Sequence, residues 1–273
     1  MKVVQLFVIV ALITLFVCSS NGLQTLRNCK NYWPTATNPN PQLFYEYLPP
    51  TFGNGTAAPV IIFLHGVGQG GTYPQDVVRI LGVGLAKLID TGGWPANFPF
   101  VVLSPWHTSG WPDAITVQST LEALPSLYGN KVDLTRVYVT GLSAGGGGTI
   151  HFPGLSLANA NRIAAVVPIA IAWYDKKFFA PMANSGLPFW GFANEYDSPF
   201  YNITGTVTNA LNGLGINPPA KFTVYKKTSG HGGWDQTYNP VNNVNDIYSW
   251  MLKYSTTNRL PPTPTTTTST TTI

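Results

Sequence analysis

The sequence predicts a doubly wound α/β domain, a mostly parallel sheet with helices on both faces. Short, wholly apolar runs such as residues 60–64 are typical of strands that are covered on both faces. Stretches with helical spacing of apolar residues, such as residues 74–89, separate these runs. A run with β-branched Val137, Val139 and Thr140 leads directly into a glycine-rich turn. In a sheet of this class, ligands bind at the carboxyl ends of the strands.

Strand and helix candidates alternate along the chain. We expect a strand over residues 43–48 at an edge of the sheet, and further strands over 60–64, 100–103, 136–140, 164–172, 188–193 and 222–225. We expect helices over residues 74–89, 114–128 (bent or ended by Pro125), 144 to about 152, 200–211 and 244–254. This regular alternation favours a parallel sheet.

Both ends of the chain differ from the domain between them. In residues 1–22, one Lys precedes an apolar run over 6–17 that is too short to span a bilayer, and small residues follow it. We expect a signal peptide cleaved near residues 20–22, hence a secreted protein with no membrane association afterwards; a retained anchor is the alternative. Residues 23–258 form the predicted domain, and the Thr- and Pro-rich residues 259–273 predict a disordered, O-glycosylated tail.

Features of the predicted mature chain fit secretion. Cys29 is its only cysteine after cleavage, so it is free or pairs between chains. The triplets that begin at Asn54 and Asn202 are N-glycosylation acceptors. Charged residues make up only 10% of the sequence, and the net charge of +4 comes from scattered Lys and Arg. No basic stripe suggests nucleic acid as a partner. We expect no cofactor and no metal, and the oligomeric state stays open.

The glycine-rich turn contains a G-x-S-x-G pattern, formed by Gly141, Ser143 and Gly145 with the residues between them. Between a strand and a helix, this pattern strains the serine backbone and exposes its hydroxyl above the strand ends. An ordinary turn serine is the alternative interpretation. A phosphate-binding loop is excluded because Gly147 stands where that motif requires Lys.

A nucleophilic serine needs a histidine base and an acid that orients it. Of the four histidines, only His231 follows the last predicted strand, where this architecture places the base. The acid is expected on the loop after residues 188–193. Asp197 has the best reach there, with Glu195 and Asp175 as alternatives.

The oxyanion of an acyl-transfer intermediate needs two N–H donors. The backbone N–H of Ala144 directly follows the nucleophile. The loop after residues 60–64 begins His65-Gly66-Val67-Gly68, which has the pattern of an H-G-x-G oxyanion loop. The Val67 N–H is therefore the second candidate donor, and His65 would stabilise the loop. A plain glycine-rich turn is the alternative.

Residues 60–252 resemble the α/β-hydrolase superfamily. The segments that carry the resemblance are FLHGVGQGG, DLTRVYVTGLSAGGGGT, NEYDSP, and GHGGWDQTY with YSWML behind it. They are most similar to the secreted esterase branch, which includes polyhydroxybutyrate depolymerases, feruloyl esterases, acetyl-xylan esterases and predicted peptidases. The resemblance implies the α/β-hydrolase fold and a serine hydrolase. Many members of the branch have Gly at the position of Asn194, so Glu195 stays an alternative to Asp197.

The interval between residues 172 and 188, where similar hydrolases insert a cap, is short, which predicts an open groove without a large cap domain. Trp106, His107, Trp111 and Trp234 follow the relevant strands and would form an aromatic rim; packing and loop anchoring are the alternative roles. Together with the Thr-rich tail, an open groove fits an ester on a polymer or polysaccharide, and a small-molecule ester stays open as the alternative substrate. A serine peptidase with the same triad, or a non-catalytic adhesion protein on this fold, is the alternative function.

Overall fold

The computed structural model describes residues 24–28, 43–107, 112–241 and 245–259. The predicted signal peptide, Cys29, Trp111 and residues 260–273 of the predicted tail lie outside these ranges. No helix within them is long and apolar enough to cross a membrane. Within the same ranges, no group of three or more His, Cys, Asp or Glu side chains is arranged to hold a metal ion.

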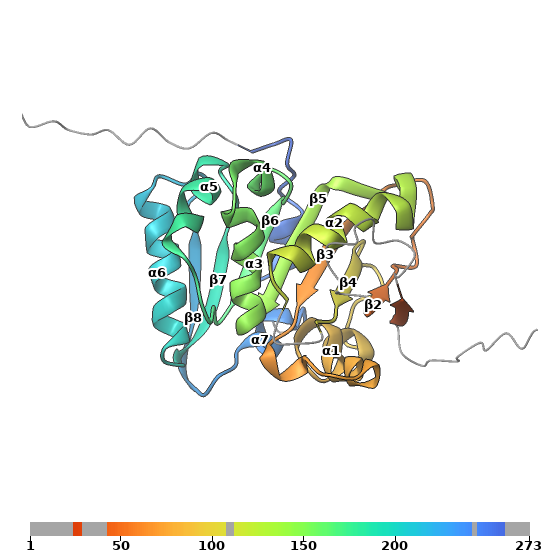
Figure 1. Cartoon of the computed structure of the whole chain (residues 1–273), viewed down its shortest axis with the longest axis horizontal. Coiled ribbons are helices and arrows are strands. Elements are labelled where there is room, and N and C mark those ends of the chain that lie inside the picture. Colours follow the sequence, from red (N-terminus) through yellow and green to blue (C-terminus); the bar gives the residue numbers. More distant parts are fainter. Residues whose placement is uncertain (1–23, 29–42, 108–111, 242–244, 260–273) are drawn as a thin grey trace, which may run out of the picture.

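Eight strands form one sheet in the order β1-β2-β4-β3-β5-β6-β7-β8 (Figure 1). The strands are β1 (Thr25–Asn28), β2 (Leu43–Tyr47), β3 (Ala58–Leu64), β4 (Val101–Pro105), β5 (Val132–Leu142), β6 (Ala165–Ile169), β7 (Trp190–Tyr196) and β8 (Lys221–Ser229). In this spatial order, all neighbouring strands from β4 through β3 to β8 are parallel. The pairs β1–β2 and β2–β4 are antiparallel. The predicted doubly wound, mostly parallel sheet is therefore confirmed.

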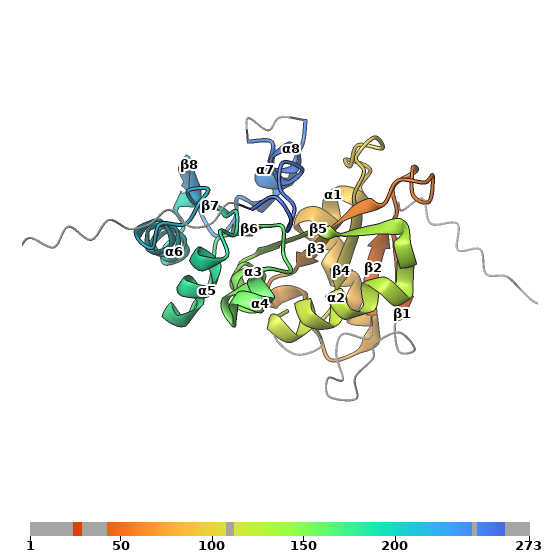
Figure 2. The ribbon, with the colours of Figure 1, turned by 90° about the horizontal axis from the view of Figure 1, so that it is seen from above.

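Helices cover both faces of this sheet (Figure 2). On one face lie α2 (Ala114–Tyr128), α3 (Ala144–Gly154), α4 (Leu157–Ala160), the short η4 (Lys176–Phe178), α5 (Phe179–Asn184) and α6 (Phe200–Gly213). On the other face lie η2 (Pro74–Gly82), α1 (Gly84–Asp90), α7 (Trp234–Tyr238) and α8 (Ile247–Met251). The turns η1 (Val67–Gln69) and η3 (Gly129–Lys131) complete the described elements.

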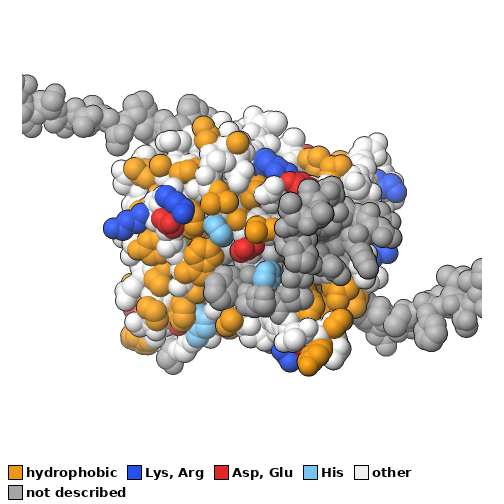
Figure 3. All heavy atoms as spheres, in the orientation of Figure 1, with side chains coloured by type: hydrophobic (Ala, Val, Ile, Leu, Met, Phe, Trp, Pro, Cys, Tyr) orange, Lys and Arg blue, Asp and Glu red, His pale blue; other side chains and the backbone are white. Residues whose placement is uncertain are grey.

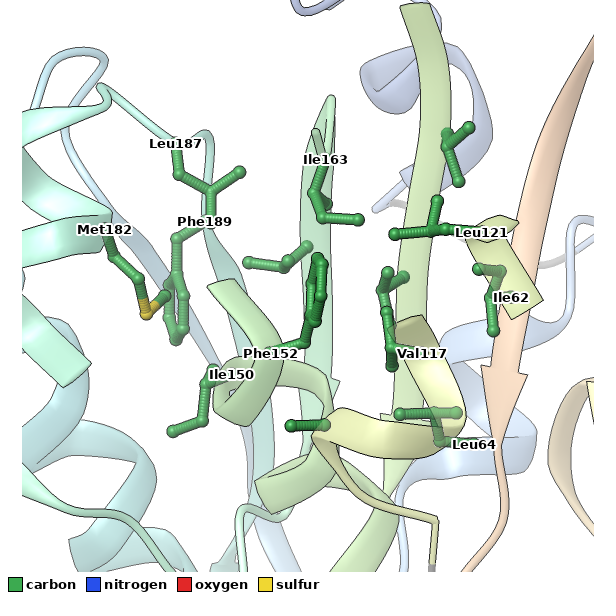
Figure 4. Close-up of a cluster of buried hydrophobic side chains, with 14 of the residues drawn as sticks. Ile62, Leu64, Val117, Leu121, Ile150, Phe152, Ile163, Met182, Leu187 and Phe189 are labelled. Carbon is green, nitrogen blue, oxygen red and sulfur yellow. The ribbon is translucent and has the colours of Figure 1, made fainter. Parts of the chain in front are cut away.

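The core consists of two clusters, one on each face of the sheet. Alternation along β3 sends Ile62 and Leu64 into the cluster under α2 and α3, and Ile61 and Phe63 into the opposite one. Figure 4 shows the first cluster, where Phe152 of α3 lies among side chains from the strands, α2 and α5. A strand that is buried on both faces reads as a continuous apolar run, which is why β3 was predictable.

Some elements differ from the prediction. The strand at residues 43–48 is not at the edge, because β1 pairs outside it. Residues 74–89 do not form one helix: Val83 is extended and Gly84 has a φ of +55°, so the chain breaks between η2 and α1. The helix α2 continues past Pro125, which lies in its last turn. The predicted 244–254 helix is shorter and begins after Asp246, whose carboxylate caps α8.

Candidate active site

Ser143 lies in the sharp turn between β5 and α3. Its φ of 56° and ψ of −120° are uncommon for an L-residue and store strain, which packing of the surrounding chain must offset. The Ser143 N–H donates to the Ile169 carbonyl at 2.9 Å, and the Ser143 carbonyl accepts from the Ala172 N–H at 3.2 Å. Both hydrogen bonds join the turn to the end of β6, so the neighbouring strand holds the strained backbone of Ser143 in place.

Two glycines of the G-x-S-x-G pattern are required by close backbone approach. A Cβ at Gly145 would lie 2.2 Å from the Leu64 carbonyl oxygen, and one at Gly141 would lie 2.5 Å from the Gly145 carbonyl oxygen. Neither backbone oxygen can move without breaking the turn or the loop after β3. The pattern therefore reflects how tightly α3 packs on the sheet at its N-terminus.

The structure brings Ser143, His231 and Asp197 into one hydrogen-bonded array. His231 Nε2 lies 2.7 Å from Ser143 Oγ, and His231 Nδ1 lies 2.9 Å from Asp197 Oδ2. An ionised carboxylate only accepts hydrogen bonds, so Nδ1 donates to Asp197 and Nε2 is left to accept from the serine hydroxyl. The Asp197 side chain is only 3% exposed, whereas that of His231 is 34% exposed.

The alternative acids have other partners. Glu195 accepts from Lys226 Nζ at 2.9 Å and from the Lys227 N–H at 2.8 Å. These two hydrogen bonds lower the pKa of its carboxyl group. Asp175 caps η4 and pairs with Lys177 at 3.0 Å. Of the three candidate acids, the structure therefore places only Asp197 against the imidazole.

Asn194 joins the acid loop to the histidine loop, a role that sequence reasoning missed. Its buried side-chain amide donates to the Gly230 carbonyl at 3.0 Å, and its backbone carbonyl accepts from the Asp197 N–H at 3.2 Å. This tether uses a side chain, which a glycine at the same position lacks.

The two candidate oxyanion donors lie on either side of the serine. Ala144 is the first residue of α3, so its N–H has no acceptor within the helix. On the other side, a Cβ at Gly66 would lie 3.4 Å from Ser143 Cβ, which places the start of η1, and hence Val67, beside Ser143. The arrangement fits an oxyanion hole built from both backbone groups.

His65 is fully buried and links the loop after β3 to the loop after β4. The His107 N–H donates to His65 Nε2 at 3.1 Å, so the proton of the neutral ring sits on Nδ1, which donates to the Gly66 carbonyl at 2.6 Å. Burial lowers the pKa of His65 to about 4. His65 is thus held as a neutral ring, in a single tautomer, beside the candidate oxyanion loop.

The described residues of the predicted aromatic rim differ in their exposure. Trp106 is 2% exposed and donates from Nε1 to the Gln69 carbonyl at 3.0 Å, so it anchors the loop that contains η1 instead of lining a groove. For Trp106 the structure thus shows loop anchoring, the alternative role. His107 is half-buried, and Trp234 is half-buried with its ring 5.1 Å from that of His231.

Two half-buried aromatic residues near the serine were not predicted. Trp173 follows β6, packs over Gly147, and donates from its indole to the Ala144 carbonyl at 3.3 Å. Phe200 begins α6 and stacks on His231 with the ring centroids 4.0 Å apart. In sequence, Trp173 is an aromatic residue at the end of an apolar run and Phe200 is one in a polar loop, so no local signal marks either.

A scan against protein-family models finds none that matches the chain, and a search of curated proteins finds no relative. Solved structures with the same fold are found. A thermostable esterase has a TM-score of 0.60 at 20% identity, covering 86% of this chain and 63% of its own. A feruloyl esterase module from Clostridium thermocellum complexed with sinapinate has a TM-score of 0.51 at 15% identity, covering 72% and 81%.

The dipeptidyl peptidase 4 of Porphyromonas gingivalis is also similar, with a TM-score of 0.55 at 13% identity, covering 85% of this chain and 35% of its own. Esterases and a peptidase thus share this arrangement of strands and helices. The chain spans less than two thirds of the length of the thermostable esterase. The eight-stranded sheet, the serine turn after β5 and these likenesses together show that the chain has the α/β-hydrolase fold.

Proposed function

We propose that this protein is a secreted serine carboxylic ester hydrolase that works through an acyl-enzyme. The observation that carries the proposal is the unbroken hydrogen-bonded array from Ser143 through His231 to the buried Asp197. Such an array converts a weak hydroxyl nucleophile into a reactive one. It lies at the carboxyl ends of parallel strands, where this class of sheet binds ligands.

The geometry leads to a two-step reaction. His231 Nε2 takes the hydroxyl proton as Ser143 Oγ attacks the ester carbonyl, and Asp197 stabilises the imidazolium that forms. The N–H groups of Val67 and Ala144 stabilise the oxyanion. The imidazolium then gives its proton to the departing alcohol. Water, deprotonated by the same imidazole, cleaves the acyl-enzyme and regenerates the serine.

An ester on a polymer or polysaccharide is the substrate class we favour. Between β6 and β7 the chain forms only η4 and α5, without a cap domain, and the His231 side chain is one-third exposed. The half-buried Trp173 and Trp234 offer aromatic surface for a sugar ring or an aromatic acyl group. An open site of this kind admits a chain that extends beyond the scissile bond.

The central test is Ser143→Ala. We expect kcat/KM on p-nitrophenyl acetate to fall by about 10⁴-fold or more, with an unchanged circular dichroism spectrum. A fluorophosphonate probe should label the wild type and not the variant. Ser126→Ala, an exposed serine in α2, is the matched control and should keep full activity and labelling. Wild-type turnover in Ser143→Ala would refute the proposal, and a wild type that takes up no probe would favour an adhesion protein.

Substrate class is tested by a panel of feruloylated and acetylated xylan, polyhydroxybutyrate and small soluble esters. Cleavage of small esters alone would contradict a polymeric substrate. A peptidase has the same triad, so kcat/KM is compared between matched ester and anilide substrates. A higher value on the anilide would replace the esterase proposal with the peptidase one.

A further inference from the structure

The loop that carries His231 has little rigidity of its own. Gly230 and Gly233 flank the histidine segment and have φ values of +80° and +89°, and Gly232 lies between them. Glycine-rich segments lose much conformational freedom when they are fixed. The tether from Asn194 fixes the Gly230 carbonyl, but it does not fix the plane of the imidazole ring. The hydrogen bonds to Asp197 and Ser143 hold the two ring nitrogens, but they tolerate tilting of the ring, which only packing against its faces restricts.

Two aromatic rings contact the imidazole directly. The Phe200 ring stacks on one face of His231, with a centroid distance of 4.0 Å and an interplanar angle of 29°. The Trp234 ring meets His231 edge-on, at 5.1 Å and 83°. A stacked ring blocks rotation of the imidazole out of its plane, because that rotation would drive an imidazole edge into the aromatic face.

The element that carries Phe200 is itself firmly held. The Phe200 carbonyl accepts from Thr204 Oγ1 at 2.9 Å, and the same hydroxyl oxygen accepts from the Ile171 N–H at 3.0 Å. Thr204 is fully buried, so this link joins the start of α6 to the end of β6. The Tyr201 N–H also donates to the Asp197 carbonyl at 2.8 Å. Phe200 therefore shares its support with the acid of the triad.

We propose that Phe200 is a positioning residue that, with Trp234, holds the His231 imidazole in the plane shared by Asp197 Oδ2 and Ser143 Oγ. This inference rests on the proposed hydrolase function. Phe200 acts through His231 and takes no part in proton transfer. Its effect belongs to the chemical steps, because misalignment of a reacting group lowers their rate without weakening substrate binding.

The kinetic test compares Phe200→Leu with Phe200→Tyr. We expect Phe200→Leu to lower kcat and the fluorophosphonate labelling rate by about 10-fold with KM unchanged, and Phe200→Tyr, which keeps the aromatic face, to stay within about twofold of wild type. Tyr201→Leu is the matched control. It keeps the backbone N–H that bonds to Asp197 and removes an aromatic ring from the same helical turn, but that ring packs on Phe222, at 5.7 Å, and not on His231. It should leave kcat unchanged.

A spectroscopic readout tests the stacking without relying on activity. A ring stacked at 4.0 Å should shift the imidazole C–H proton resonances of His231 upfield, and Phe200→Leu should return them toward ordinary values. Absence of the upfield shift in the wild type would overturn the inference even if Phe200→Leu failed to fold. Equal kcat in Phe200→Leu and wild type, with Ser143→Ala inactive, would also overturn it while the hydrolase function stands. Wild-type turnover in Ser143→Ala would instead refute the function.

Discussion

Asp197 and Glu195 are two residues apart, yet their environments differ completely. The Asp197 carboxylate is buried against the imidazole, and the Glu195 carboxylate faces Lys226 and the Lys227 N–H at the exposed end of β7. A buried carboxylate with a single hydrogen-bonding ring beside it is suited to fix a tautomer. A surface ion pair contributes little to stability.

Asp197→Asn should therefore lower kcat/KM by about 10²- to 10⁴-fold, because an amide can donate to Nδ1 and so favour the wrong tautomer. Glu195→Gln, the matched control, should stay within about twofold of wild type. Esterase assays on both purified variants measure this. A larger loss in Glu195→Gln than in Asp197→Asn would assign the acid to Glu195.

His65 makes stability depend on pH. Burial lowers its pKa to about 4 in the folded protein, whereas an unfolded histidine takes up its proton near pH 6.5. Between these two values the unfolded chain binds the proton and the folded chain does not. The free energy of unfolding therefore falls as the pH is lowered through this window, by about 3 kcal/mol in all.

We expect His65→Asn, which has nothing to titrate here, to lose less stability on acidification. Urea unfolding of wild type and variant at pH 7 and pH 4.5 measures the difference. The loss between the two pH values should be smaller in the variant by about 2–3 kcal/mol. Equal losses in the two proteins would mean that His65 is not held neutral.

At the scale of elements, α3 lies unusually close to the loop after β3. The contact depends on Gly145, where a Cβ would lie 2.2 Å from the Leu64 carbonyl oxygen and 2.4 Å from that of His65. The position is helical, so its glycine is explained by this contact and not by a left-handed backbone. The same contact sets the distance between Ser143 and the candidate oxyanion loop.

Gly145→Ala should lower the free energy of unfolding by more than about 2 kcal/mol and abolish most activity, because the backbone carbonyls of Leu64 and His65 cannot both move away from the added methyl group. Gly205→Ala in α6 is the matched control. Its Cβ would meet only the Phe222 ring, at 3.4 Å, so the helix should gain about 0.5–1 kcal/mol. Thermal unfolding and esterase assays on the two variants check both statements. Unchanged activity in Gly145→Ala would show that α3 has room to move.

At the scale of the whole molecule, one sheet separates two apolar clusters, and β3, β4, β5 and β6 each contribute side chains to both. Ile61 and Ile62 are neighbours in β3, both fully buried, and they enter opposite clusters. Unfolding of these strands would therefore expose both clusters to water. On the molecular surface, the face shown in Figure 3 has few charged side chains among the described residues, and they form no basic stripe there.

Ile61→Ala and Ile62→Ala should each lower the free energy of unfolding by about 2–5 kcal/mol, and each should leave a single thermal transition. Differential scanning calorimetry measures both properties. A second transition in either variant would show that the two sides of the sheet unfold separately.

The sequence alone determined the class of sheet, the turn that carries Ser143, and the order of the candidate nucleophile, acid and base along the chain. These features are local, because apolar runs, glycine spacing and the order of the loops can each be recognised from short stretches of sequence. Only the tertiary structure decided that Asp197 and not Glu195 contacts His231, that Trp106 is buried, and that Phe200 stacks on the imidazole. These outcomes depend on which side chains meet across loops far apart in sequence, and such contacts arise only when the strands are assembled side by side.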